Sequence, residues 1–219
     1  MSNQLLFINL ATVRADDFQC RHIAKPSTLA ASVNPSIYMI DFKDNIVKKA
    51  DSLISKAKSL PGIHFEWQEP VEINCSEIDN FQFGIAEIQF ERLKNNRHFP
   101  AIYYFKLLDN SDNTQIINAL DGFRGLKVRS CPKIDRRRST DSDFLYCGSV
   151  RNNLHGRVIQ HLGNGHKDTY ALQLKHWACK LELRLALHHA LVDKEFVDFT
   201  ELIESALADY LTPLVGKLA

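Results

Sequence analysis

Five side chains between residues 103 and 204 have the types and spacings of one small reactive site. They are Tyr103, Tyr146, Arg157, His161 and Glu204. Arg157 and His161 stand four residues apart on a helical stretch, so they share a helix face. A guanidinium stays protonated and suits phosphate oxygens, whereas a phenol or an imidazole can take or relay a proton. This set of groups indicates hydrolysis of a phosphodiester.

Each member also has an ordinary structural interpretation, which the residues alone leave open. Arg157 and Glu204 could be solvated surface groups, and His161 could be a buried structural histidine. Tyr103 competes with Tyr104, because successive strand residues point to opposite faces. Glu201, one helical turn before Glu204, is the nearest rival carboxylate.

Apolar patterning predicts the elements that would position these groups. From residue 101 onward we expect strands over 101–108, 144–150 and 180–187, and helices over 154–162, 169–177 and 200–211. Thr200 is expected to cap the last helix. Residues 1–96 match no motif and are predicted to form an α+β accessory region. There we expect strands over 5–10, 36–42, 63–67 and 83–90 and a helix over 45–60.

The same residues resemble the GIY-YIG nuclease family, which includes homing endonucleases, a subunit of the bacterial excision-repair nuclease and some restriction enzymes. Ala101-Ile102-Tyr103 is similar to the first family strand and Tyr146-Cys147-Gly148 to the second. Arg157 and His161 match the helix that follows, and Glu204 stands nine residues before a proline, as the family glutamate commonly does. Gly216 departs from the pattern, because the family often has asparagine there.

The resemblance implies a fold and a mechanism for residues 97–219. The fold class is α/β (α+β), with a small, mainly antiparallel sheet flanked by helices and an insertion at about 109–142. Glu204 would hold Mg²⁺ or Mn²⁺, and Arg157 would stabilise the transition state. Tyr103 would be the general base, while Tyr146 would orient water or phosphate and His161 would position or shuttle a proton. The large insertion favours the compact restriction-enzyme branch.

Charge supplies a candidate nucleic-acid surface. The formal net charge is only +1, so affinity for DNA must come from a local patch. Between residues 124 and 157 nine basic residues face three acidic ones. Arg136, Arg137, Arg138 and Arg151 are the predicted contacts to phosphates, which would give sequence-independent, salt-sensitive affinity.

These observations predict a metal-dependent endonuclease acting on DNA, with duplex DNA as the favoured partner. A homodimer is left open. The alternative is a module on a degenerate GIY-YIG fold that binds nucleic acid or a partner without cleaving. The five cysteines include no CxxC pair and read as reduced thiols. No apolar run reaches membrane-spanning length and the start lacks a signal peptide's basic residues, so we expect a cytoplasmic protein without membrane contact.

Overall fold

A computed structural model describes residues 35–78, 87–108, 112–134 and 141–216. The chain divides into two compact units, residues 1–49 and 50–219. Helix α1 (Pro35–Ser59) begins in the first unit with a proline, whose fixed φ suits the first helical turn. The strand expected over 36–42 is therefore wrong, and the helix expected from 45 begins ten residues earlier. The strand expected over 5–10 lies outside the described residues.

The second unit is a mixed α+β structure built on one antiparallel sheet. Its strands are β1 (Glu66–Trp67), β2 (Val71–Asn74), β3 (Ala101–Leu107), β4 (Phe144–Val150) and β5 (Arg184–Leu191). The strand order is β1-β5-β3-β4, and β2 also pairs with β5. The prediction of a small antiparallel sheet flanked by helices is confirmed. Because β1 and β2 both pair with β5, the sheet extends into residues before 97.

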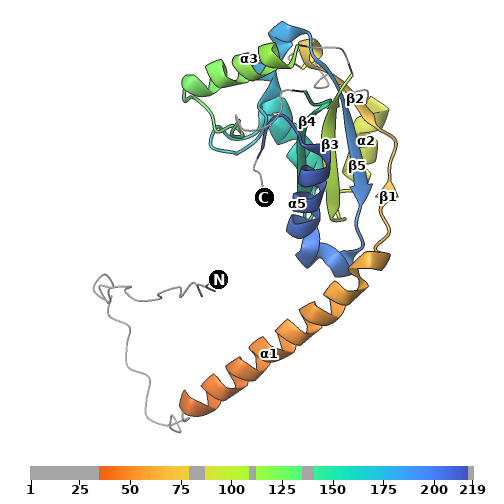
Figure 1. Ribbon diagram of the computed structural model, residues 1–219, viewed down its shortest axis with the longest axis vertical. Coiled ribbons are helices and arrows are strands. Elements are labelled where there is room, and N and C mark those ends of the chain that lie inside the picture. Colours follow the sequence, from red (N-terminus) through yellow and green to blue (C-terminus); the bar gives the residue numbers. More distant parts are fainter. Residues whose placement is uncertain (1–34, 79–86, 109–111, 135–140, 217–219) are drawn as a thin grey trace, which may run out of the picture. The chain divides into compact units, whose positions relative to one another are not determined.

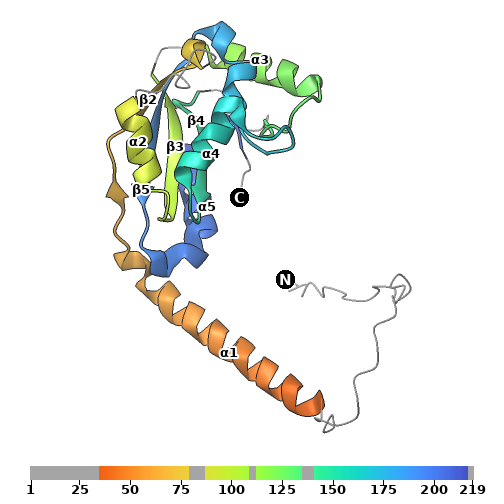
Figure 2. The same ribbon diagram turned by 180° about the vertical axis from the view of Figure 1, so that it is seen from behind.

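Helices cover both faces of this sheet. Helix α5 (Thr200–Leu211) covers one face, in front in Figure 1, and α4 (Leu154–Ile159) with α2 (Glu87–Asn95) covers the other, in front in Figure 2. Alternation along β3 serves the two faces: Tyr103 and Phe105 belong to the main core, whereas Tyr104 packs toward α5. Helix α3 (Asn113–Gly125) lies within the expected insertion.

Several elements differ locally from the pattern-based expectation. Residues 169–177 form a loop with one short 3-10 turn, Leu174–His176, because Gln173 adopts a left-handed conformation with φ 59°. Strand β5 begins four residues later than expected, and residues 87–90 are helical rather than extended. Residues 83–86 lie outside the described segments. The strand expected over 63–67 shortens to β1.

The end of the described chain lies along strand β4. After α5, the amides of Leu214 and Val215 donate to the carbonyl oxygens of Phe144 and Leu145 at 2.8 and 3.0 Å. Val215 also forms a β-bridge with Ile134, near the end of the insertion. Within the described residues no helix has both the length and the apolar character to cross a membrane.

Candidate active site

A glycine on β4 lets one tyrosine approach the strand backbone. Gly148 pairs with Tyr103 across β3 and β4. A Cβ atom at position 148 would lie 2.6 Å from the Tyr103 Oη atom, too close for any real contact. Because residue 148 has no side chain, the Tyr103 hydroxyl can lie directly against the backbone of β4.

Helix α4 brings Arg157 to that hydroxyl. The helix starts at Asn153, a left-handed residue with φ 57°, whose side chain accepts a hydrogen bond from the Gly156 amide at 3.0 Å. Asparagine tolerates this conformation better than most residues, and its side chain satisfies an otherwise unpaired helix amide. One turn later, Arg157 Nε donates to Tyr103 Oη at 3.2 Å, and Arg157 Nη1 donates to Gln160 Oε1 at 3.0 Å.

His161 reaches the same oxygen from a wider, π-helical turn that follows α4 and spans Gln160–Asn164. Its Nε2 atom lies 2.8 Å from Tyr103 Oη. Its other nitrogen, Nδ1, accepts the backbone N–H of Leu172 at 3.1 Å. A neutral imidazole carries one proton, so Nδ1 as acceptor leaves that proton on Nε2. Tyr103 Oη therefore accepts two hydrogen bonds, from His161 and from Arg157.

Burial sets the charge state of this cluster. His161 and Tyr103 are fully buried. Burial, with Arg157 nearby, lowers the pKa of His161 well below its usual value, so the imidazole is neutral. Burial and the neighbouring Tyr146 raise the pKa of Tyr103 well above its usual value, and Arg157 acts in the opposite direction. At neutral pH the phenol thus keeps its proton. Neither His161 nor Arg157 accepts that proton, because each donates a hydrogen bond to the phenol oxygen.

The ring of Tyr146 packs near those of Tyr103 and His161. Its ring centroid lies 5.0 Å from that of His161 and 6.3 Å from that of Tyr103. Burial raises the pKa of Tyr146, while a Coulombic interaction and a hydrogen bond with Arg157 lower it. The Arg157 guanidinium therefore interacts with both phenols and acts to lower the pKa of each. It is also the partly exposed member of this group.

Gly216 lies against the ring of Tyr146 and has a backbone conformation that favours glycine over asparagine. A Cβ atom there would come within 3.6 Å of the ring. The residue has φ 124°, a conformation that side chains rarely adopt. Its amide donates to the Lys133 carbonyl oxygen at 3.0 Å. Asparagine at this position would be strained with the backbone in this conformation.

Glu204 approaches from α5, on the other face of the sheet. Ser149 Oγ donates to Glu204 Oε2 at 2.6 Å. The carboxylate raises the pKa of both Tyr103 and Tyr146, so it lies close enough for its charge to act on the phenols. Sequence reasoning did not identify Ser149. The sequence does place Ser149 directly after Gly148 on a predicted strand, so its side chain is expected on the opposite face from position 148.

The carboxylate is suited to a hard divalent cation. Among the described residues, Glu204 Oε1 accepts no hydrogen bond, while the Ser149 hydroxyl orients the other oxygen. No group of three or more His, Cys, Asp or Glu side chains in the described segments could hold a metal. Mg²⁺ commonly keeps several waters and uses one or two carboxylates with substrate phosphates. The oriented Glu204 carboxylate would supply one of the protein ligands that such a site uses.

Other predicted residues lie elsewhere. Arg151 is exposed, and its Nη2 atom lies 3.9 Å from Oε1 of Glu201, the rival carboxylate. Tyr104 points to the opposite sheet face from Tyr103 and stacks on His188, with ring centroids 4.7 Å apart. Thr200 is the first residue of α5 rather than its cap, and its hydroxyl donates to the Val197 carbonyl oxygen. Arg136, Arg137 and Arg138 lie outside the described residues.

Comparison of the chain with protein-family models, with curated proteins and with solved structures finds no significant match.

Proposed function

We propose that residues 97–219 form a GIY-YIG-like nuclease domain that hydrolyses phosphodiester bonds of duplex DNA with Mg²⁺ or Mn²⁺. The observation that carries the proposal is the pair of N–H donors on Tyr103 Oη, one from Arg157 and one from His161. Donors aimed at one oxygen favour its ionised form, whereas burial raises the pKa of Tyr103, so the phenol ionises only when water reaches it. The arrangement is suited to a tyrosinate that accepts a proton from a water molecule.

His161 acts by orientation rather than by taking the phenolic proton. Its Nδ1 lone pair is engaged by the Leu172 amide, and its Nε2 proton points at Tyr103. Because Tyr103 is fully buried in this conformation, the phenolic proton has to pass to a water molecule that enters when Arg157 moves onto the substrate. The tyrosinate oxygen then removes a proton from the attacking water, which forms a bond to phosphorus as the bond to the leaving oxygen breaks.

Arg157 connects the buried base to the substrate. Tyr103 is fully buried, whereas Arg157 and Glu204 are partly exposed. An incoming phosphate meets the guanidinium first, whose planar donors match phosphate oxygens. Movement of Arg157 onto the phosphate would open Tyr103 Oη to water. Glu204, held by Ser149, would bind the cation. When bound, the cation stabilises charge on the phosphoryl oxygens and lowers the pKa of a bound water.

A non-cleaving nucleic-acid-binding module remains the second candidate, and one observation favours it. The complete burial of Tyr103 closes the proposed base to solvent in this conformation. If Arg157 does not move, phosphate could still bind at the guanidinium without hydrolysis.

A matched pair of glutamate variants separates these functions. Glu204→Gln removes the charge with little change of shape, and we expect nicking of supercoiled duplex DNA in Mg²⁺ to fall by on the order of 100-fold. Glu201→Gln, one turn earlier on α5, is the control and should retain the wild-type rate.

Tyr103→Phe should abolish nicking, whereas Tyr104→Phe on the opposite face should not. Wild-type rates in Glu204→Gln or Tyr103→Phe would remove those residues from the mechanism. DNA binding without nicking by the wild-type protein would favour the second candidate.

A further inference from the structure

A basic cavity lies beside the loop that follows the π-helical turn. Its volume is about 310 Å³. One wall comes from the end of α3 and the residues after it, and the other comes from the loop that contains Asp168. The polar lining residues are Arg124, Lys127, Arg129, Ser130, Cys131 and Asp168. Three cationic groups thus share the cavity with one carboxylate.

The opposing charges near the cavity leave a positive excess. Asp168 contacts the imidazole of His166, with Oδ2 and Nδ1 3.5 Å apart. Arg124 pairs with Asp121 at 3.4 Å, while among the described residues Lys127 has no ion-pair partner. Burial raises the pKa of Cys131 to about 11, although Arg124 and Arg129 act to lower it. The thiol is therefore neutral and leaves the cationic character intact.

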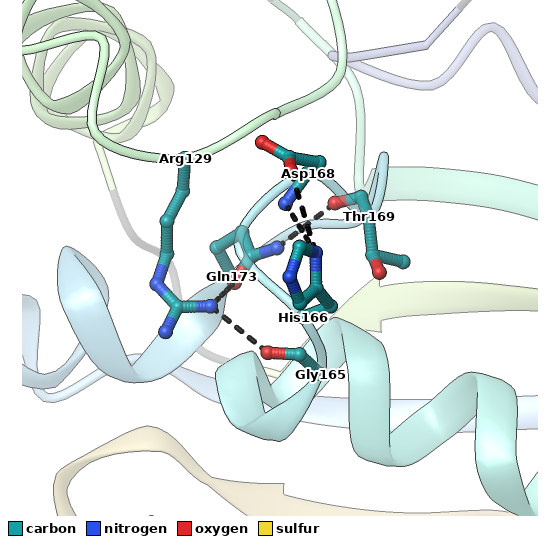
Figure 3. Close-up of polar contacts among 6 residues, drawn as sticks. All are labelled: Arg129, Gly165, His166, Asp168, Thr169 and Gln173. Carbon is teal, nitrogen blue, oxygen red and sulfur yellow. Dashed lines mark hydrogen bonds and ion pairs between the residues drawn. The ribbon is translucent and has the colours of Figure 1, made fainter.

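Arg129 is fixed in place by the opposite wall. Its Nη1 atom donates to the Gly165 carbonyl oxygen at 3.1 Å and to Gln173 Oε1 at 3.3 Å, as Figure 3 shows. Gln173 is fully buried, and its Nε2 atom donates to the Thr169 carbonyl oxygen at 3.0 Å. The other nitrogens of Arg129 make no hydrogen bond to described residues. They form a preorganised set of donors, which loses less entropy when an anion binds.

The loop that forms this wall also touches the candidate active site. Leu172, the neighbour of Gln173, donates the backbone hydrogen bond that sets the tautomer of His161. A phosphate bound at Arg129 would therefore contact the same loop that orients the proposed base. This link favours a substrate phosphate over an unrelated anion.

We propose that this cavity binds a backbone phosphate of duplex DNA, so that α3 and the residues after it hold the substrate beside the active site. The inference rests on the proposed function in taking the nuclease substrate as the ligand. Phosphate contacts position a protein on DNA without reading sequence, so the contribution should be equal for all duplexes.

Lys127 and Arg124 are the residues to change, because Arg129 also holds the loop. Lys127 has φ 54°, and Lys127→Asn keeps a residue that tolerates this conformation. The test protein carries Lys127→Asn with Arg124→Gln. The control carries Lys48→Gln with Lys58→Gln on α1, an equal loss of charge at exposed positions that do not line the cavity. Thermal unfolding is measured for both.

Binding of a labelled duplex is measured by fluorescence anisotropy over a salt series without divalent cation, so that no cleavage occurs. Loss of two phosphate-contacting charges should reduce the slope of log affinity against log salt by about 1.8. We expect that reduction in the test protein, for duplexes of unrelated sequence, and none in the control. Inorganic phosphate at matched ionic strength should compete with the duplex for the wild-type protein only weakly.

An unchanged slope in the folded test protein, or an equal change in the control, would overturn the inference. Strong competition by inorganic phosphate alone would also overturn it, because it would show a free-anion site. The failure of the nuclease proposal is distinguishable, since it appears as absent nicking while the salt slope still depends on Lys127 and Arg124.

Discussion

Gly148 offers the sharpest test of how the candidate site is built. In Gly148→Ala the added methyl group would lie 2.6 Å from Tyr103 Oη, 2.7 Å from Tyr103 Cζ and 3.0 Å from Tyr146 Cε1. Ordinary van der Waals contacts begin near 3.4 Å. The Tyr103 ring would have to retreat, yet it is fully buried and meets Phe105 and His161 edge-on.

The cost has two parts. Overfilling a well-packed core costs about 1–3 kcal/mol, and disturbing a hydrogen bond to a charged donor such as Arg157 costs about 1.5–3 kcal/mol. The two parts overlap, because the same movement causes both. We expect a loss of about 3 kcal/mol in the free energy of unfolding, together with loss of nicking activity.

Urea unfolding followed by circular dichroism measures this change, with the slope m checked for constancy. Gly122→Ala is the control, because a Cβ there meets nothing within 4 Å and the residue lies inside α3. That variant should be more stable by about 0.5–1 kcal/mol. If Gly148→Ala unfolds within about 0.5 kcal/mol of wild type, the close approach of Tyr103 to β4 is wrong.

Two further predictions concern stability. Burial, then His188, lowers the pKa of His189 from 6.5 to about 4. Above pH 6.5 this shift has no effect on stability, because the imidazole is neutral in both states; the free energy of unfolding falls as pH drops from 6.5 toward 4, because the unfolded chain binds the proton more readily. The loss is about 3 kcal/mol, so His189→Leu should flatten unfolding free energies measured across that range. Asn153→Ala should cost about 2 kcal/mol in urea unfolding, because it loses both the helix cap and an αL-tolerant residue. Asn153→Gly should cost only a few tenths, and equal costs would contradict the cap geometry.

The elements that hold the site were predictable where periodicity and length agree. Strands β3 and β4 and helix α5 fall where apolar patterning places them. The pattern failed at 36–42, where an apolar, aromatic run resembles a strand but forms the first turns of a long helix. It failed again at 169–177, where the left-handed Gln173 contacts Arg129, which is distant in sequence, as well as the nearby Thr169 carbonyl oxygen.

The sequence predicted which residue types form the site, but not the hydrogen bonds that join them. Residue spacing can suggest that Arg157 and His161 lie on the same face of a helix. It cannot show that the Leu172 amide engages Nδ1 of His161, because that donor is a backbone group on a later loop. The Ser149 contact to Glu204 depends on how α5 crosses β4, which no local pattern encodes. Tertiary placement decides both.

The segment that lies along β4 also bears on self-association. An exposed edge strand offers unpaired backbone groups to a second chain, and such edges promote aggregation. In the described structure, Leu214 and Val215 occupy two carbonyl groups of β4 just before Tyr146, and Ile134 bridges to Val215. A second copy could extend the sheet at these carbonyls only after displacing this segment. The segment that ends with Gly216 at the ring of Tyr146 therefore also protects the sheet from growing between molecules.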